Sequence, residues 1–480
     1  MHFCNIIVIF CKLAIYFVTI FCYNVLHIII SILYKTKQLH SEGGIGLKYI
    51  KILLCLLLVC TLFSGCSFKI ASSIDELISP VSPFGENADI QKAMDNLCPN
   101  GYSLKNPNTG NFVTSYNFYD IDGDDRDEAF AFYEPADKLG TINLAILDIN
   151  DGIWQSVESI AGEGKDIHSL DFNDVNGDGK EEVLICWDAL PNSTNHQLVI
   201  YSIGNDESDY ALTPVANSIT INNYICVDMN SDKIDELMLF EINTSSSMGA
   251  KAELYSFADN KMSLLGDTKL DSHITSYTNV QIEYAEDDVR VYADAIGSDG
   301  HSMLTEVIYW SNSYDTIVSP FYSYYSGRTS STTRKSIINS VDINDDGLID
   351  IPTNTTVKGL PNEVSAIDWM IYKNTTLVHT NYSYFVQQDG YHIILPVNDV
   401  SKITASYDKD RREMTLYNKL TKKAIVSVMP VLKAVYNEAD YEDYSVVLDN
   451  SGYYYLAKVG TDKDIIITID NLKQNLKSVN

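Results

Sequence analysis

The sequence predicts a mostly β protein built from a repeated four-stranded unit, and three observations predict this class. A nine-residue acidic segment occurs four times, and the starts of the copies are separated by 54, 54 and 114 residues. Runs of β-forming residues recur in step with these segments. Turn residues separate the runs, and no long stretch has the apolar spacing of a helix.

Each copy of the repeat contains four runs of β-forming residues, which in the first copy are residues 111–119, 129–134, 142–149 and 154–160. Leu147, Tyr201 and Tyr255 all lie 27 residues after the first Asp of their acidic segment. Tyr309 lies in a run of the same kind, but the residues 27 positions before it lack the motif. The sequence therefore predicts five copies between residues 111 and 383, one of them without an acidic segment.

Four-stranded units of about 40–55 residues are typical of a β-propeller, so the predicted fold is a propeller with five visible blades. Each blade buries its faces against its neighbours, and the array must close into a ring or be capped. A β-sandwich is the alternative, which the fixed offsets disfavour. Residues 384–480 lack the motif and are interpreted as a small C-terminal α+β or β domain with a closing helix at 465–476. Further blades completing a ring of six or seven are the other interpretation.

The acidic segments carry oxygen-bearing side chains at alternate positions. Positions 1 and 5 are always Asp, position 3 is Asp or Asn, and position 9 is Glu or Asp. In a tight loop such side chains converge on one point, where Ca²⁺ accepts six to eight oxygens, including the backbone carbonyl of position 7. The predicted ligands of up to four calcium sites are Asp120, Asp122, Asp124, Arg126, Glu128, Asp174, Asn176, Asp178, Lys180, Glu182, Asp228, Asn230, Asp232, Ile234, Glu236, Asp342, Asn344, Asp346, Leu348 and Asp350.

The acidic segments have two other interpretations. An EF-hand needs a bidentate Glu at position 12 and a following helix, but position 12 is apolar or Thr here and lies beside a predicted strand. A solvated acidic turn without metal is the other alternative, and four copies in register disfavour it. The second segment, with Gly177 and Gly179 in its turn, is expected to be the best site. The third, with Ser231 and Lys233 at those positions, is expected to be the weakest.

The pattern D-x-[DN]-x-D-x-x-x-[DE] followed by a strand resembles the FG-GAP/VCBS repeat, the calcium-binding blade of integrin alpha-chain propellers and of many bacterial surface proteins. The resemblance covers residues 111–383, but the Phe-Gly and Gly-Ala-Pro signatures of the family are absent, so the chain is similar to a divergent member. The resemblance implies that the calcium ions are structural, stiffen the blades, and lie opposite the usual partner-binding face.

Two apolar stretches precede the repeats. The second has a basic start at 48–51, an apolar run at 52–63 and the residues Ser64, Gly65 and Cys66, and it resembles a bacterial lipoprotein signal peptide with its lipobox. This resemblance implies a lipid anchor on Cys66 and export to the outer face of the cell membrane of a Gram-positive bacterium. Two interpretations stay open for residues 1–46: a transmembrane helix, or codons upstream of a true start at Leu47.

The predicted organisation begins with an apolar segment at 1–46 and a signal peptide at 47–66. A linker at 67–110 follows, with a short helix near residues 90–97. The repeats occupy 111–383 and the C-terminal part 384–480. The chain has 34 Lys and Arg against 64 Asp and Glu, a net charge of −30. This charge excludes a nucleic-acid binder, which needs a basic surface. Eighteen of the acids lie in the four acidic segments, so part of the charge is assigned to the cation sites.

No catalytic motif was found, since HExxH, GxSxG, the P-loop and GxGxxG are all absent. Cys and His residues are not arranged at zinc-site spacing either. The predicted function is a non-enzymatic, surface-anchored binding or adhesion module for a protein or glycan. The alternative is a cell-wall or polysaccharide-acting hydrolase or lyase that uses two scattered carboxylates. The Tyr-rich stretch 314–325 is either a contact patch for the partner or strand packing.

Overall fold

The computed structural model describes residues 86–478 with short gaps at 205–209, 244–248, 259–260, 286–287 and 396–399. The predicted lipidation site Cys66, the predicted signal peptide and residues 1–46 lie outside the described residues. The described part is mostly β, as predicted, with antiparallel sheets and two α-helices. Neither of these helices is long and apolar enough to cross a membrane.

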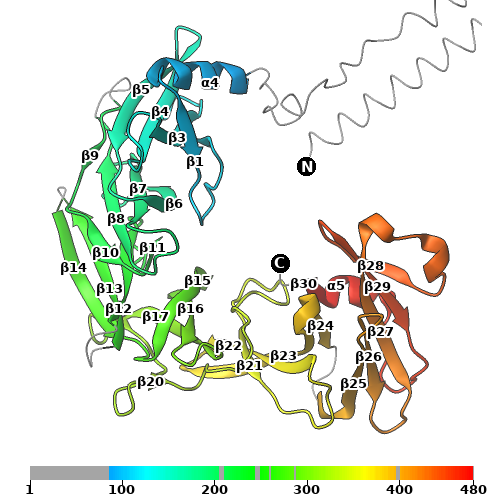
Figure 1. The fold of residues 1–480 in the computed structure, drawn as a ribbon. Coiled ribbons are helices and arrows are strands. Elements are labelled where there is room, and N and C mark those ends of the chain that lie inside the picture. Colours follow the sequence, from blue (N-terminus) through cyan, green and yellow to red (C-terminus); the bar gives the residue numbers. More distant parts are fainter. Residues whose placement is uncertain are drawn as a thin grey trace, which may run out of the picture. The chain divides into compact units, whose positions relative to one another are not determined.

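The first two repeats form five-stranded sheets (Figure 1). Sheet 1 contains β1 (Tyr102–Lys105), β2 (Asn117–Tyr119), β3 (Glu128–Pro135), β4 (Asn143–Asn150) and β5 (Ile153–Ala161). Sheet 2 contains β6 (Asp166–Asn173), β7 (Glu182–Asp188), β8 (His196–Ser202), β9 (Thr213–Pro214) and β10 (Ile219–Ile221).

The next two repeats form four-stranded sheets, each built from consecutive strands. Sheet 3 contains β11 (Asn223–Val227), β12 (Glu236–Asn243), β13 (Gly249–Ala258) and β14 (Lys261–Lys269). Sheet 4 contains β15 (Ile274–Ala285), β16 (Asp288–Gly297), β17 (Met303–Ser311) and β18 (Thr316–Val318). A small hairpin follows, made of β19 (Tyr322–Ser323) and β20 (Arg328–Thr329).

The last repeat and the C-terminal residues form two more five-stranded sheets. Sheet 5 contains β21 (Ile351–Asn354), β22 (Val364–Lys373), β23 (Thr376–Val386), β24 (Tyr391–Leu395) and β30 (Leu476–Ser478). Sheet 6 contains β25 (Ile403–Asp408), β26 (Glu413–Asn418), β27 (Ala424–Leu432), β28 (Ser445–Asp449) and β29 (Tyr453–Val459). The expected boundary at residue 383 falls inside β23, because sheet 5 continues through it and takes its last strand from the C-terminal segment.

The strand registers repeat as the sequence offsets do. Leu147 pairs with Ala129 on β3, and in the next two sheets Tyr201 pairs with Val183 and Tyr255 with Leu237. These pairs occupy equivalent positions in each repeat. In the copy without the motif, β15 and β16 pair as a hairpin, so this copy is present although it has no acidic segment.

Consecutive sheets pack face to face, and one buried apolar cluster lies between each pair. Phe130 and Leu144 of sheet 1 share a cluster with Ile185 and Val199 of sheet 2. Similar clusters join sheets 2 and 3, sheets 3 and 4, and sheets 4 and 5. Because one face of each sheet is apolar toward the next, the repeats are stabilised mainly by their neighbours.

Helix α4 (Glu86–Leu97) covers the remaining face of sheet 1. Its apolar residues Ile90, Ala93, Met94 and Leu97 have helical spacing and pack on β3, β4 and β5. The predicted linker at 67–110 therefore includes a packed helix. At the other end, sheet 6 shares a buried core with sheet 5 and with Leu472 of helix α5 (Ile469–Asn475). Helix α4 at one end, and sheet 6 with α5 at the other, cap the stacked sheets in the way that an open array of repeats needs. Closure of the sheets into a ring stays a prediction.

Candidate metal centres in the acidic loops

The four acidic segments form loops, called loop 1 (120–128), loop 2 (174–182), loop 3 (228–236) and loop 4 (342–350). Loops 1 to 3 each connect the first and second strands of a repeat: β2 to β3, β6 to β7, and β11 to β12. Loop 4 is closed at its two ends by the isolated bridge between Val341 and Asp350, and the strand β21 follows it directly. All four loops therefore occupy the same place in the repeat.

The predicted ligand side chains fold into the same hydrogen-bonded arrangement in every loop. The position 1 carboxylate accepts backbone N–H groups of positions 5 and 6 at 2.8–3.2 Å. Oδ1 of position 5 accepts the N–H of position 7 at 2.9 Å, and position 9 accepts the N–H of position 2 at 2.9–3.2 Å. Backbone donors therefore orient these carboxylates and leave lone pairs for a cation.

Two positions of each loop adopt the left-handed backbone region. Position 4 has a φ of +60° to +79°, and position 6 has a φ of +66° to +86°. Loop 2 has Gly177 and Gly179 there, whereas loop 3 has Ser231 and Lys233. A side chain in this region costs about 1–2 kcal/mol, so the loops differ in conformational strain although they share one geometry.

The position 9 carboxylates are buried without a charged partner. Their exposed fractions are 0–2%, and burial raises the pKa of Glu128, Glu182 and Glu236 to about 7 and that of Asp350 to about 6. Among the ion pairs of the described residues, none involves these four carboxylates. Burying a carboxylate without a counter-charge is unfavourable, so these positions fit a bound cation.

Loop 1 brings together the densest set of carboxylates. Ligand oxygens of Asp120, Asp122 and Asp124 lie within 4.8 Å of one another. Glu128 Oε1 is buried and has no hydrogen-bond partner within the described part of the chain, because Asp122 stands where loops 2 and 3 have a donating Asn. An orphaned carboxylate oxygen beside three others is the donor set that Ca²⁺ prefers. Arg126 of the same loop pairs with Asp124, and Ca²⁺ would supply the positive charge that Glu128 lacks.

Residues that immediately precede loops 1 and 2 link these loops to their neighbours. The rings of Tyr119 and Phe172, just before loops 1 and 2, stack at 4.1 Å. Asn173 Nδ2 donates to Asp235 of loop 3 at 2.7 Å. The preceding repeat has no acidic loop, and loop 4 instead contacts a strand of sheet 4, where its Ile349 N–H donates to Glu283 of β15 at 2.7 Å. Loops 1 to 3 thus form a row along one edge of the stacked sheets.

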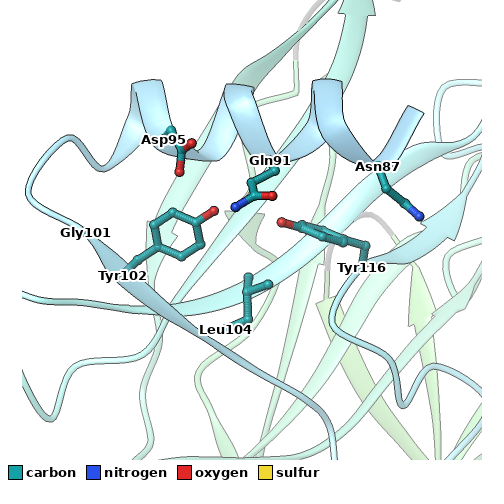
Figure 2. Close-up of a pocket in the computed structure, with 7 residues that line it drawn as sticks. All are labelled: Asn87, Gln91, Asp95, Gly101, Tyr102, Leu104 and Tyr116. Carbon is teal, nitrogen blue, oxygen red and sulfur yellow. The ribbon is translucent and has the colours of Figure 1, made fainter. Parts of the chain in front are cut away.

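A hollow of about 550 Å³ lies between helix α4 and β1 (Figure 2). Asn87, Gln91 and Asp95 are spaced four residues apart along the helix, and the hydroxyl groups of Tyr102 and Tyr116 point toward Gln91 in Figure 2. This hollow is polar and aromatic but holds no acidic loop.

A second hollow contains residues that the sequence did not single out. Among them are His168 on β6 and His196 on β8, whose rings stack with centroids 3.6 Å apart. Burial and the neighbouring His196 lower the pKa of His168 to about 4. The two residues are 28 positions apart on different strands and match no metal-binding spacing, so only the β6–β7–β8 pairing brings them together.

Comparisons with known proteins assign no family to this chain. No family model and no curated protein matches the chain. Two solved structures align with 67% of this chain and 71% of their own, both at 12% identity: the crystal structure of rhamnogalacturonan lyase YesW, with a TM-score of 0.25, and Bacillus licheniformis rhamnogalacturonan lyase PL11, with 0.26. A likeness at this level carries no argument about activity.

Proposed function

We propose that this protein is an exported lipoprotein, anchored through Cys66, whose FG-GAP/VCBS-like blades bind Ca²⁺ and act as a rigid, non-enzymatic binding module. The observation that carries the proposal is the set of four loops with one hydrogen-bonded carboxylate arrangement and buried position 9 acids that lack a cationic partner. The propeller-type arrangement of these blades is part of the proposal.

Calcium would act on the stiffness of the repeat array. Each loop joins the two strands that begin its repeat, and loops 1 to 3 lie beside one another. A cation held by side chains from positions 1 to 9 fixes that connection. Rigid loops would keep the neighbouring sheets in register and present the rest of the surface to a partner with little loss of entropy on binding.

The exposed tyrosines of the 314–325 stretch support a contact patch for that partner. The side chains of Tyr314, Tyr324 and Tyr325 are exposed, and the rings of Tyr322 and Tyr324 contact each other edge to face. Tyrosine provides a large contact area with little rotamer entropy to lose, and it suits both protein and glycan surfaces. Tyr324 and Tyr325 lie in the turn between β19 and β20.

Calcium titration tests the metal part of the proposal. Isothermal titration of the purified protein should show up to four Ca²⁺ equivalents. Asp120→Asn combined with Asp124→Asn should remove one equivalent, because two of the loop 1 carboxylates are lost. Asp410→Asn, an exposed acid outside the loops, is the control and should leave the number unchanged. A protein that takes up no Ca²⁺ would refute the metal sites.

Binding to cell-surface material tests the module part. The purified protein should bind a glycan array or a surface protein fraction in Ca²⁺, and Tyr324→Ala with Tyr325→Ala should weaken that binding. The double variant Tyr436→Ala with Tyr441→Ala changes two other tyrosines that stack on each other and serves as the control. Equal loss in both double variants would contradict a specific role for the β19–β20 turn.

The alternative, an enzyme acting on cell-wall or other polysaccharide, gains support from one feature. The second hollow contains two His side chains and a Tyr224 hydroxyl that donates to Asp171, so titratable groups do meet in a cavity. Hydrolase and lyase assays on peptidoglycan and on acidic and neutral polysaccharides would distinguish the two functions. Turnover abolished by His168→Gln would favour the enzyme over the binding module.

A further inference from the structure

The second hollow lies where three successive repeats meet. Its volume is about 340 Å³, and its walls come from the first strands of sheets 2, 3 and 4, namely β6, β11 and β15, together with residues of β7, β8 and the segment that contains Thr109 and Gly110. None of the four acidic loops contributes to the wall. Whatever this hollow binds is therefore independent of the calcium sites.

Three metal-ligating side chains meet beside the hollow, and two of them, His168 and His196, line its wall. Asp188 ends β7, His196 begins β8, and the two residues are cross-strand partners whose side chains are hydrogen-bonded through His196 Nδ1. The third, His168, stacks on His196. One ligand atom from each of the three residues lies within 4.8 Å of the others, and Asp188 and His196 are buried.

An irregularity in the sheet directs His168 toward this wall. The pairing of β6 with β7 shifts between Ile167 and Ser169, so His168 is the extra residue of a β-bulge. Bulges re-aim side chains and are over-represented next to active sites. The backbone carbonyl of His168 is also held, because it accepts the N–H of Thr109 at 2.9 Å. The ring position is thus set by backbone geometry as well as by stacking.

The same hollow contains buried polar atoms that lack partners. The hydroxyl oxygens of Ser169 and Tyr277 are buried, and within the described residues neither has a hydrogen-bond partner. Ser169 as a whole is 5% exposed. Leaving a buried hydroxyl unsatisfied costs about 1–3 kcal/mol. Two such groups lining one hollow, beside the three ligating side chains, point to a bound species that they would contact.

We propose that His168, Asp188 and His196 bind a divalent transition metal of the Zn²⁺ class, with one coordination position open to the hollow. Two imidazoles and one carboxylate suit Zn²⁺ and similar ions, whereas Ca²⁺ needs six to eight oxygens. Three protein ligands with a free fourth position are the arrangement of sites that bind an exogenous ligand. Ligand atoms in such a tetrahedral site lie about 3.4 Å apart, so binding would draw the three side chains closer than the present limit of 4.8 Å.

A matched control exists elsewhere in the chain. His379 and Asp368 also form a hydrogen-bonded pair, with Nδ1 and Oδ1 2.5 Å apart, on neighbouring strands of sheet 5. In the part of the chain that the structure describes, this pair does not belong to a group of three ligating side chains. It therefore reproduces the His–Asp contact without the third ligand and should not bind the metal tightly.

The test uses the purified protein at a Ca²⁺ concentration that fills the loops, with Co²⁺ and Zn²⁺ as the probes. One equivalent of Co²⁺ should produce the strong visible absorption of a four-coordinate site, and Zn²⁺ should abolish it by displacement. His168→Gln and His196→Gln should each weaken Zn²⁺ binding by about a hundredfold or more, since loss of a second-shell contact alone costs 10- to 100-fold. His379→Gln should bind Zn²⁺ as the wild type does.

Three results would overturn the proposal: no Co²⁺ absorption in the wild type, a weak six-coordinate spectrum, or Zn²⁺ affinity unchanged in His168→Gln. The wild-type spectrum decides the matter even where His196→Gln fails to fold. Far-UV circular dichroism of each variant separates loss of a ligand from loss of structure. Since Ca²⁺ is saturating throughout, failure of this site leaves the calcium proposal standing, and failure of the loops leaves this one standing.

Discussion

Buried carboxylates have different partners in the repeat without an acidic loop and in the repeats with one. In sheet 4, Glu283 is buried on β15 and pairs across the hairpin with Arg290 at 2.6 Å. Asp294 on β16 pairs with the fully buried Arg334 at 2.9 Å. In the loop-bearing repeats, the buried position 9 acids have hydrogen bonds but, among the described residues, no ion pair.

This difference concerns the source of positive charge for each buried carboxylate. Where the chain carries its own guanidinium group, a buried carboxylate is stabilised by an internal cation. Where it does not, the proposed Ca²⁺ would supply the positive charge. In the copy without the motif, the β15–β16 hairpin stands in place of the acidic loop, and two arginines pair with the buried carboxylates Glu283 and Asp294. The predictions below test this division, from the largest expected effect to the smallest.

Removing calcium should destabilise the loop-bearing repeats and spare sheet 4. At free Ca²⁺ a hundredfold above the dissociation constant, each site contributes about 2.7 kcal/mol to the folded state. EDTA should lower the thermal midpoint strongly. Hydrogen exchange should increase in β3, β7 and β12, while β16 keeps its protection. Equal loss of protection in all four strands would contradict the comparison.

Replacing the internal cation should be costly whether or not calcium is present. Arg334→Met leaves Asp294 buried and unpaired, and breaking a buried pair in this way costs about 3–5 kcal/mol. Denaturant unfolding should show the same loss in Ca²⁺ and in EDTA. Lys335→Met, at the exposed neighbouring residue, is the control and should change stability by less than about 0.5 kcal/mol. A loss of stability seen only in EDTA would contradict the distinction between acids paired with arginine and acids assigned to Ca²⁺.

Loops 2 and 3 should respond in opposite directions to exchanges at position 6. Gly179→Ala should cost about 1–2 kcal/mol, because φ is +86° and no atom lies within 4 Å of the added methyl group, so the effect is conformational. Lys233→Gly should stabilise loop 3, since the residue there has a φ of +75°. Thermal unfolding in EDTA measures both. Destabilisation by Lys233→Gly would show that the Lys side chain makes a compensating contact.

Calcium affinity should rise with pH. The position 9 Glu residues have pKa values raised to about 7 by burial, so Ca²⁺ must displace a proton near neutrality. From pH 6 to pH 7 the ionised fraction, and with it the affinity, should increase about fivefold, or about 1 kcal/mol per site. Calorimetry in two buffers of different ionisation enthalpy would detect the released proton. Affinity independent of pH would mean that these acids are already ionised.

The same shifts act in the opposite direction on the calcium-free protein. A folded-state pKa above the unfolded value means that the folded state binds more protons between about pH 4.5 and 7. The calcium-free protein should therefore lose stability as the pH rises through this range. Glu283 and Asp294 of sheet 4 provide the internal reference, because each is paired with an arginine. Glu306 on β17 is buried too, and because burial raises its pKa to about 7 it should add to the same loss of stability.

The repeat and its acidic loops were predictable because they depend on short-range patterns. Residues such as Asp174, Asp178 and Glu182 lie within nine positions of one another, and the left-handed turn between them is encoded locally by Gly177 and Gly179. The offset of 27 residues that located Leu147, Tyr201 and Tyr255 reflects a strand register that recurs in the structure.

The boundaries and the covers of the array were not predictable in this way. A helix near residues 90–97 was expected in a linker, yet α4 packs on sheet 1, because what lies on a sheet face depends on contacts distant in sequence. The supposed boundary at residue 383 was placed where the motif ends, but β23 continues through it and β30 returns to the same sheet from residues 476–478.

By itself, the sequence determined the strand content, the five copies and the positions of the candidate calcium ligands, since these follow from residue types at fixed local spacing. Only the tertiary structure decided which buried acids meet an arginine and which do not. It also brought His168, Asp188 and His196 together across three strands through a bulge. Both outcomes depend on pairing and packing between distant segments, where no local pattern constrains the neighbours of a side chain.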